Sequence, residues 1–123
     1  MKIGFVRIFV SDFKKSLSFY TDTLGMKLDC TVGDFWAQFD SGVDISLAIV
    51  ACDPAEIDLS GGRKVGRYCG VNLLVDDIDE TYQRLRDKGV EFTMPPQLQS
   101  WGRTLAEFKD LDGNVLTLMD AGE

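Results

Sequence analysis

The sequence predicts an α+β fold built from two similar units in tandem. Two observations carry this prediction. Stretches that alternate apolar and polar side chains flank two stretches with helical spacing, and the order strand–helix–strand–strand–strand occurs twice along the 123 residues. Each unit alone would expose one face of a small sheet, so pairing the units is the natural way to bury it. We therefore predict one domain, with a first unit at 1–50, a linker at 51–66 and a second unit at 67–120.

The first unit begins with an alternating strand at 2–10, followed by a helix. Ser11 or Asp12 is expected to cap this helix, and Gly25 is expected to end it. Its apolar side chains recur at helical spacing at Phe13, Leu17, Tyr20 and Leu24. Three further strands are predicted at 26–32, 34–40 and 43–50.

The second unit repeats this order after a linker that is rich in Pro, Gly and charged residues. A strand is predicted at 68–75, and a capped helix at 76–89 ends at Gly89. Its inward side chains are expected to be Ile78, Tyr82 and Leu85. The last three strands are predicted at 90–94, 103–110 and 114–120.

The absence of histidine excludes several classes of chemistry. The 123 residues contain no His at all, which removes the usual general base at neutral pH and the commonest metal ligand. Ser-His-Asp and Cys-His nucleophile systems are excluded for the same reason. The glycine-rich stretch at 61–66 has no hydrophobic strand before it, so we interpret it as a loop and not as a phosphate site.

Charge and cysteine content indicate the setting of the protein. A formal net charge of −7 argues against nucleic acid and anionic membranes as partners. No apolar run approaches the length of a membrane span, and the N-terminus lacks the pattern of a signal peptide. The three cysteines, Cys30, Cys52 and Cys69, are widely spaced and odd in number, which suits a reducing compartment. We therefore expect a cytoplasmic protein.

Three segments carry a family resemblance that spans nearly the whole chain in order. They are VSDFKKSLSFYTDTLGMKL, VNLLVDDIDETYQRLRDKGVEF and WGRTLAEFKDLDGN. With them the chain resembles the vicinal oxygen chelate superfamily, also called the glyoxalase/bleomycin resistance/dioxygenase fold. The resemblance implies two βαβββ modules whose curved mixed sheets form a cleft, usually in a homodimer. It does not fix the function.

The resemblance also implies where a metal would be held. Enzymes of this superfamily bind a divalent metal through His, Glu or Gln on the first and last strands of each module. The corresponding positions here are Phe5, Ser46, Gly70 and Thr117, none of which suits a transition metal. An alternative is that Asp44 and Glu107 hold Mg²⁺ weakly together with water. We expect no metal and no cofactor.

The cleft implied by the resemblance supplies a candidate binding site. Strand side chains alternate in direction. We therefore expect Phe35, Ala37 and Phe39 to lie in the core, and Trp36 and Gln38 to point toward the cleft. Arg7 would either pair internally with Asp44 or Glu107, or hold an acidic group of a ligand. The expected ligand-binding residues are Phe5, Arg7, Phe9, Trp36, Gln38, Asp44, Ser46, Gly70, Asn72, Trp101, Glu107, Thr117 and Met119.

Three functions are compatible with these residues. The first is metal-independent binding of a small aromatic, cationic molecule, as in the bleomycin-resistance branch that the WGR–DLDGN segment resembles. The alternative is a glyoxalase- or dioxygenase-type enzyme, with either a metal site built from unexpected residues or a metal-free mechanism that uses Arg7, Asp44, Tyr68 or Glu107 as acid and base. A third is a ligand-dependent partner of another protein. We favour the binding protein over an enzyme, because neither histidine nor a ligand set is present.

Overall fold

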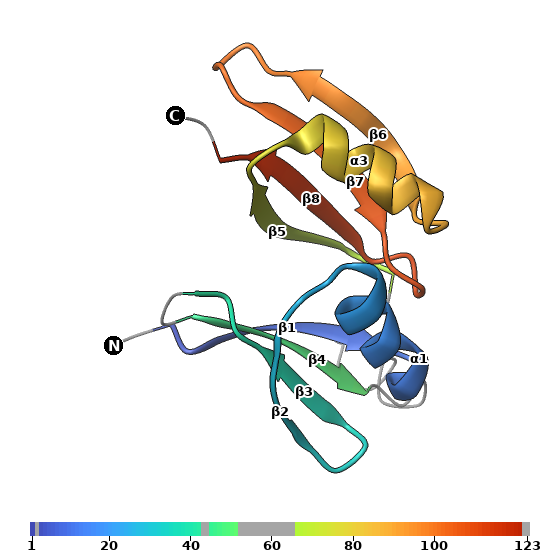
Figure 1. Ribbon diagram of the computed structural model, residues 1–123. Coiled ribbons are helices and arrows are strands. Elements are labelled where there is room, and N and C mark those ends of the chain that lie inside the picture. The colour runs from blue at the N-terminus through green and yellow to red at the C-terminus, as the bar shows by residue number, and fades with distance from the viewer. Residues whose placement is uncertain (2, 43–44, 52–65, 122–123) are drawn as a thin grey trace. The chain divides into compact units, whose positions relative to one another are not determined.

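The computed structural model describes residues 1, 3–42, 45–51 and 66–121. They form two compact units, Met1–Val65 and Gly66–Glu123, and each unit contains a four-stranded mixed sheet and a helical segment (Figure 1). Only the end residues of the predicted linker, Ala51 and Gly66, are among the described residues. No helix in the part of the chain that the structure describes is long and apolar enough to cross a membrane.

The first unit has the predicted strand–helix–strand–strand–strand order. Its strands are arranged β1-β4-β3-β2, with β1 and β4 parallel and the other neighbours antiparallel. Asp12 caps the helix, because its side chain accepts a hydrogen bond from the Lys15 backbone N–H at 3.1 Å. The elements are β1 (Phe5–Val10), α1 (Phe13–Ser18), η1 (Phe19–Thr23), β2 (Leu28–Val32), β3 (Trp36–Phe39) and β4 (Ser46–Ala51).

The helical segment of this unit departs from the predicted spacing. After α1 the chain continues as a π-helix, η1, and the Leu24 N–H bonds to the Phe19 carbonyl five residues earlier. Around this wider turn Phe19 and Tyr20 are buried, while Leu17 and Leu24 are only partly buried. Tyr20 stacks on Phe39 with ring centroids 5.8 Å apart.

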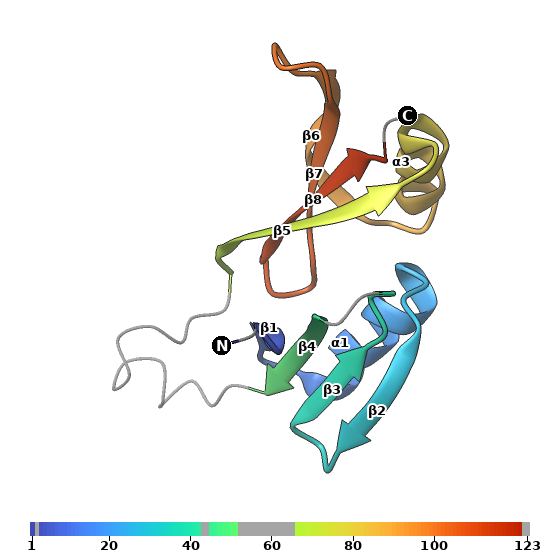
Figure 2. The same ribbon diagram turned by 90° about the vertical axis from the view of Figure 1, so that its left-hand side faces the viewer.

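The core of the first unit lies between α1 and one face of its sheet (Figure 2). Side chains on this face alternate with those on the other, as the strand period requires. In each unit we call the side of the sheet that faces away from the helix the helix-free face. The buried apolar side chains of the first unit are Ile8, Val10, Phe13, Phe19, Tyr20, Ala37, Phe39, Leu47, Ala48 and Ile49.

The second unit has strand order β5-β8-β7-β6, again with the first pair parallel. Asp77 caps its helix by accepting from the Glu80 N–H at 3.1 Å. Ile78 and Leu85 are buried as predicted, whereas Tyr82 is only partly buried and meets the Phe92 ring edge-on at 4.6 Å. The elements are β5 (Tyr68–Val75), α3 (Ile78–Asp87), β6 (Glu91–Leu98), β7 (Thr104–Lys109) and β8 (Val115–Asp120).

Asn114 fastens the turn before β8 to the start of the second unit. It is 1% exposed, and its side-chain oxygen accepts from the backbone N–H groups of Gly66 and Arg67 at 2.9 and 3.1 Å. Its amide nitrogen donates to Asp110 at 2.9 Å. A buried polar side chain that is hydrogen-bonded in this way fixes the ends of two segments together.

Two predicted strand boundaries are corrected by the structure. Phe35 is 52% exposed and lies before β3, so it is not a core residue as the alternation predicted. The strand β6 was predicted to end at 94 but continues to Leu98 through Pro95 and Pro96. Proline is tolerated there because β6 is an edge strand, where the missing N–H groups need not serve a neighbour.

Candidate functional site

Each unit presents a helix-free face whose centre is a row of three paired residues. In the first unit Arg7 pairs with Ala48, and Ala48 pairs with Gln38. In the second unit, Asn72 pairs with Thr117, and Thr117 pairs with Glu107. Both rows follow an inward-facing pair, Phe39–Leu47 in one unit and Phe108–Leu116 in the other. We call these rows the central rungs, and they occupy equivalent places in the two units.

The rung that follows differs in character between the units. In the first unit it contains Phe9, Val50 and Trp36. The second unit has Leu74, Met119 and Leu105 in the equivalent places. In these rungs the aromatic side chains therefore lie on the first unit, and aliphatic ones lie on the second.

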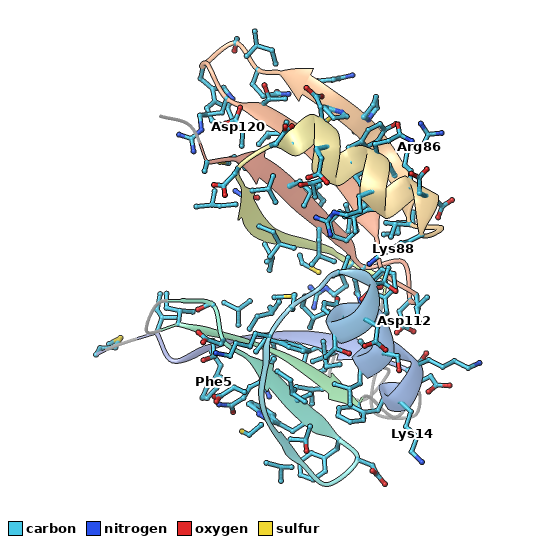
Figure 3. All side chains as sticks on the ribbon, viewed as in Figure 1. Phe5, Lys14, Arg86, Lys88, Asp112 and Asp120 are labelled. Atoms are coloured by element: carbon cyan, nitrogen blue, oxygen red, sulfur yellow. The ribbon has the colours of Figure 1, made fainter. Side chains whose placement is uncertain are left out.

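An aromatic pair spans the central rung of the first unit. Phe5 lies one rung before it and Trp36 one rung after, yet their ring centroids are 5.3 Å apart with planes at 80°. Phe5 is labelled on the first sheet in Figure 3. Their contact crosses above Ala48, which is 0% exposed although it lies on the helix-free face. The methyl group of Ala48 leaves room for the two rings to meet.

Trp36 is also held by hydrogen bonds. Its indole Nε1–H donates to Gln38 Oε1 at 3.0 Å, and Gln38 Nε2 donates to Asp29 Oδ2 at 2.9 Å. Sequence reasoning missed Asp29, because it is the extra residue of an irregularity in β2. Leu28 pairs with Phe39 and Cys30 with Gln38, so two steps on β2 match one step on β3. No signal in the sequence marks that irregularity.

Arg7 lies on the same face and is exposed to solvent. Its guanidinium carbon is 5.4 Å from the centroid of the Phe9 ring, a cation–π contact. Of the partners predicted for Arg7, Asp44 lies outside the described residues, and Glu107 belongs to the other unit. The internal ion pair therefore stays a prediction.

The central rung of the second unit is polar and has a buried hydroxyl at its centre. Thr117 is 2% exposed, and its hydroxyl finds no hydrogen-bond partner among the described residues. On either side of it, Asn72 is exposed and Glu107 is partly exposed. A buried hydroxyl without a partner costs free energy, so this rung offers polar atoms that a bound molecule could satisfy.

The observed register shows how the four positions carried over for a metal are paired in the sheets. Gly70 does not pair with Thr117, because Tyr68 pairs with Val115 and Asn72 with Thr117, which leaves extra residues on β5. Gly70 lies within this irregularity with φ +68°, a conformation that favours glycine. Ser46 pairs with Phe5, whereas the residue equivalent to Thr117 is Ala48.

Neither set of positions fits a metal ion. The second set of positions consists of the central-rung residues on the first and last strands of each unit. They are Arg7 and Ala48 in one unit, and Asn72 and Thr117 in the other. A guanidinium and a methyl group cannot ligate, and a hydroxyl and an amide are weak ligands for transition metals. Across 1, 3–42, 45–51 and 66–121, no three His, Cys, Asp or Glu side chains lie close enough together to hold a metal ion.

The remaining predicted residues lie apart from this arrangement. Trp101 is 59% exposed in the turn between β6 and β7, beyond the strands that carry the rungs. The nearby Arg103 and Asp120 form an ion pair, with Nε and Oδ1 3.2 Å apart, that ties this turn to the end of β8. Asp120 is labelled there in Figure 3.

The chain was compared with known families and proteins. The family model of the Glyoxalase/Bleomycin resistance protein/Dioxygenase superfamily matches residues 2–118. The uncharacterised protein YraH of Bacillus subtilis is 29% identical over 96% of this chain and 97% of its own length. A probable lactoylglutathione lyase of Synechocystis is 32% identical over 89% of this chain and 88% of its own length.

Solved structures show the same likeness. The crystal structure of TnmS3, an antibiotic binding protein from Streptomyces sp. CB03234, is 31% identical to this chain. It superimposes with a TM-score of 0.79 over 98% of this chain and 95% of that one. The likeness therefore extends over nearly the full length of both proteins.

Proposed function

Since the chain belongs to the Glyoxalase/Bleomycin resistance protein/Dioxygenase superfamily, we propose that it binds a small aromatic molecule without a metal ion and without converting it. The observation that carries this proposal is the Phe5–Trp36 pair over Ala48 on the helix-free face of the first unit. We further propose that the protein works as a homodimer in the cytoplasm.

The chemistry of this face supports an aromatic ligand. Phe5 is 47% exposed and Trp36 is partly exposed, so both rings offer surface beyond their mutual contact. Aromatic rings contribute about 0.5–1.5 kcal/mol per stacked pair beyond the burial of apolar area. The polar groups nearby, Arg7 and the Gln38 amide, would orient the ligand.

Binding without conversion is supported by the donor set and by one of the similar proteins. The rung positions hold no ligand set for a transition metal, and the chain contains no histidine as a general base. TnmS3 is named as an antibiotic binding protein. We propose by analogy that this chain also sequesters its ligand, and an antibiotic is one class of molecule to test.

A lyase is the second candidate, and one observation favours it. Glu107 lies beside Thr117 and across from Asn72, and could move a proton to or from a molecule on the second unit. The similarity to a probable lactoylglutathione lyase points the same way. Such an enzyme would form a product, whereas a binding protein would return its ligand unchanged.

Two flat tricyclic probes of opposite charge test the proposal. Anthraquinone-2-sulfonate and proflavine would be titrated into the metal-free protein and recovered for mass spectrometry. Binding of the anion would indicate that Arg7 selects the ligand. Binding of the cation would indicate that the net charge of −7 selects it. Absence of binding by both, or metal bound stoichiometrically after soaking with Fe²⁺, Mn²⁺, Ni²⁺ or Zn²⁺, would refute the proposal.

Substitution of the tryptophans locates the site. Trp36→Ala should weaken binding of the probe by about 1–3 kcal/mol if the indole stacks on it, and the same loss is predicted for Trp101→Ala if that ring takes part. Isothermal titration calorimetry measures both. Unchanged affinity in both variants would remove stacking from the explanation.

A further inference from the structure

We propose that Asp29 and Gln38 are positioning residues that hold the Trp36 indole in one orientation, so that the first unit offers a preformed stacking surface for a flat aromatic group. The chain of contacts is Trp36 Nε1 to Gln38 Oε1 at 3.0 Å and Gln38 Nε2 to Asp29 Oδ2 at 2.9 Å. Only the second half of this inference, the stacking surface for an aromatic ligand, rests on the proposed function. The first half, the fixed indole, is tested without any ligand.

The chemistry at the two ends of this chain allows only one arrangement. An ionised carboxylate can only accept hydrogen bonds, and an indole N–H can only donate. The amide of Gln38 lies between them, so its nitrogen must face Asp29 and its oxygen must face Trp36. With the amide reversed, its NH₂ group would face the indole N–H and its oxygen would face the carboxylate. Asp29 therefore orients the acceptor of Trp36 from a distance.

A local irregularity of the strand places Asp29 where it can do this. Cys30 is the residue paired with Gln38, and Asp29 is the additional residue between it and Leu28. An additional residue of this kind redirects a side chain and is common beside functional sites. The result is a carboxylate on the exposed edge strand β2 that reaches the partner of Trp36 in β3.

The same contacts determine what Trp36 offers to a ligand. Its N–H is already used by Gln38, and part of its ring meets Phe5 at 5.3 Å. The indole is partly exposed, so part of its ring surface remains for contact with another molecule. This subsite would therefore select a flat ring system by stacking and would not require a hydrogen-bond acceptor on that part of the ligand.

Fluorescence measures the orientation of Trp36 directly. The chain contains two tryptophans, so a Trp101→Phe background leaves Trp36 as the only indole. Asp29→Ala in this background should lower the emission anisotropy, shift the emission to the red and weaken the near-UV circular dichroism. Thr31→Ala is the matched control, because Thr31 lies on the same strand and pairs with Ala37 of the opposite face. It should change none of these signals.

Reversing the hydrogen bonds separates positioning from general destabilisation. Gln38→Glu would place two carboxylates together and should free the indole, whereas Asp29→Asn keeps an acceptor and should retain it. In the D29N/Q38E double variant, the new amide can donate to the new carboxylate, and the anisotropy should return to the value of the Trp101→Phe parent. Equal anisotropy in Asp29→Ala and the parent, or no recovery in the double variant, would overturn the positioning role.

The ligand half is tested in the chain with both tryptophans. Asp29→Ala should weaken binding of anthraquinone-2-sulfonate roughly two- to tenfold, the range expected for the loss of one hydrogen bond, and D29N/Q38E should restore it. A freed indole with unchanged affinity would overturn the stacking surface while leaving the fixed indole established. If the unaltered protein binds neither tricyclic probe, the proposed function fails, and the fluorescence result still decides the positioning role.

Discussion

Replacing Thr117 by valine should stabilise the protein. The Thr117 hydroxyl is buried and has no hydrogen-bond partner among the described residues, and an unsatisfied buried hydroxyl costs about 1–3 kcal/mol. Valine has nearly the same shape, so the substitution removes the polar atom without leaving a cavity. Because neighbouring groups relax and recover part of this cost, we expect a gain of about 1 kcal/mol in the free energy of unfolding. This corresponds to a rise in Tm of roughly 3–6 °C for a domain of this size.

Urea unfolding followed by circular dichroism measures the effect, with Thr81→Val as the matched control. Thr81 is also buried, at 6% exposed, but its hydroxyl donates to the Asp77 carbonyl at 2.8 Å. Thr81→Val should therefore destabilise the protein by about 1 kcal/mol, the opposite sign. A loss of stability in Thr117→Val would mean that its hydroxyl is bonded, and our reasoning about the central rung would be wrong. A gain accompanied by weaker ligand binding would indicate that the hydroxyl serves the ligand.

Three further substitutions test other parts of the fold. Asn114→Ala removes three hydrogen bonds from a buried side chain and should cost about 2–4 kcal/mol in urea unfolding; a loss below about 1 kcal/mol would contradict its fastening role. Burial, aided by the charge of Asp110, raises the pKa of the Cys69 thiol from 9.0 to about 11. The folded protein thus keeps the proton longer than the unfolded chain, so this stabilisation is complete below about pH 9 and is lost between pH 9 and 11. Cys69→Ala should reduce the loss of stability across that range by about 1 kcal/mol at most, since the thiol is only half-buried and is screened by solvent; an equal loss in both proteins would argue against the raised pKa. Gly70→Ala should cost about 1 kcal/mol, because φ is +68°, and Gly4→Ala, which also meets open space, is the control with no such strain.

The architecture of each unit was predictable from the sequence because alternation and capping are local signals. The strand predicted at 68–75 is β5, and of the two caps predicted for the first helix, Ser11 and Asp12, the structure has Asp12. The π-helical turn at Phe19–Thr23 was not predictable, since nothing in the apolar spacing distinguishes it from a continued α-helix. The exposure of Phe35 was missed because alternation alone does not say where a strand begins.

The candidate site was less predictable, because it depends on register. The side-chain period placed Phe5, Arg7 and Phe9 on one face, and their pairing with β4 agrees with this. The equivalence of Thr117 with Ala48, and not with Ser46, follows only from the pairing of neighbouring strands. The extra residues around Gly70 and at Asp29 shift the register of β5 and β2, and single-sequence patterns carry no record of such shifts.

The two central rungs differ in what they offer to a bound molecule. In the first unit, the small Ala48 lies under an aromatic pair, and Gln38 is used to hold Trp36. In the second unit, no aromatic contact over the equivalent Thr117 is found among the described residues, and its hydroxyl has no hydrogen-bond partner there. The helix-free face of the first unit therefore offers a surface for a flat ring, and that of the second unit offers a polar group. The change in ligand affinity caused by Thr117→Val reports on the face of the second unit, and the emission anisotropy of Trp36 reports on the face of the first. Our interpretation of either face can therefore be refuted without the other.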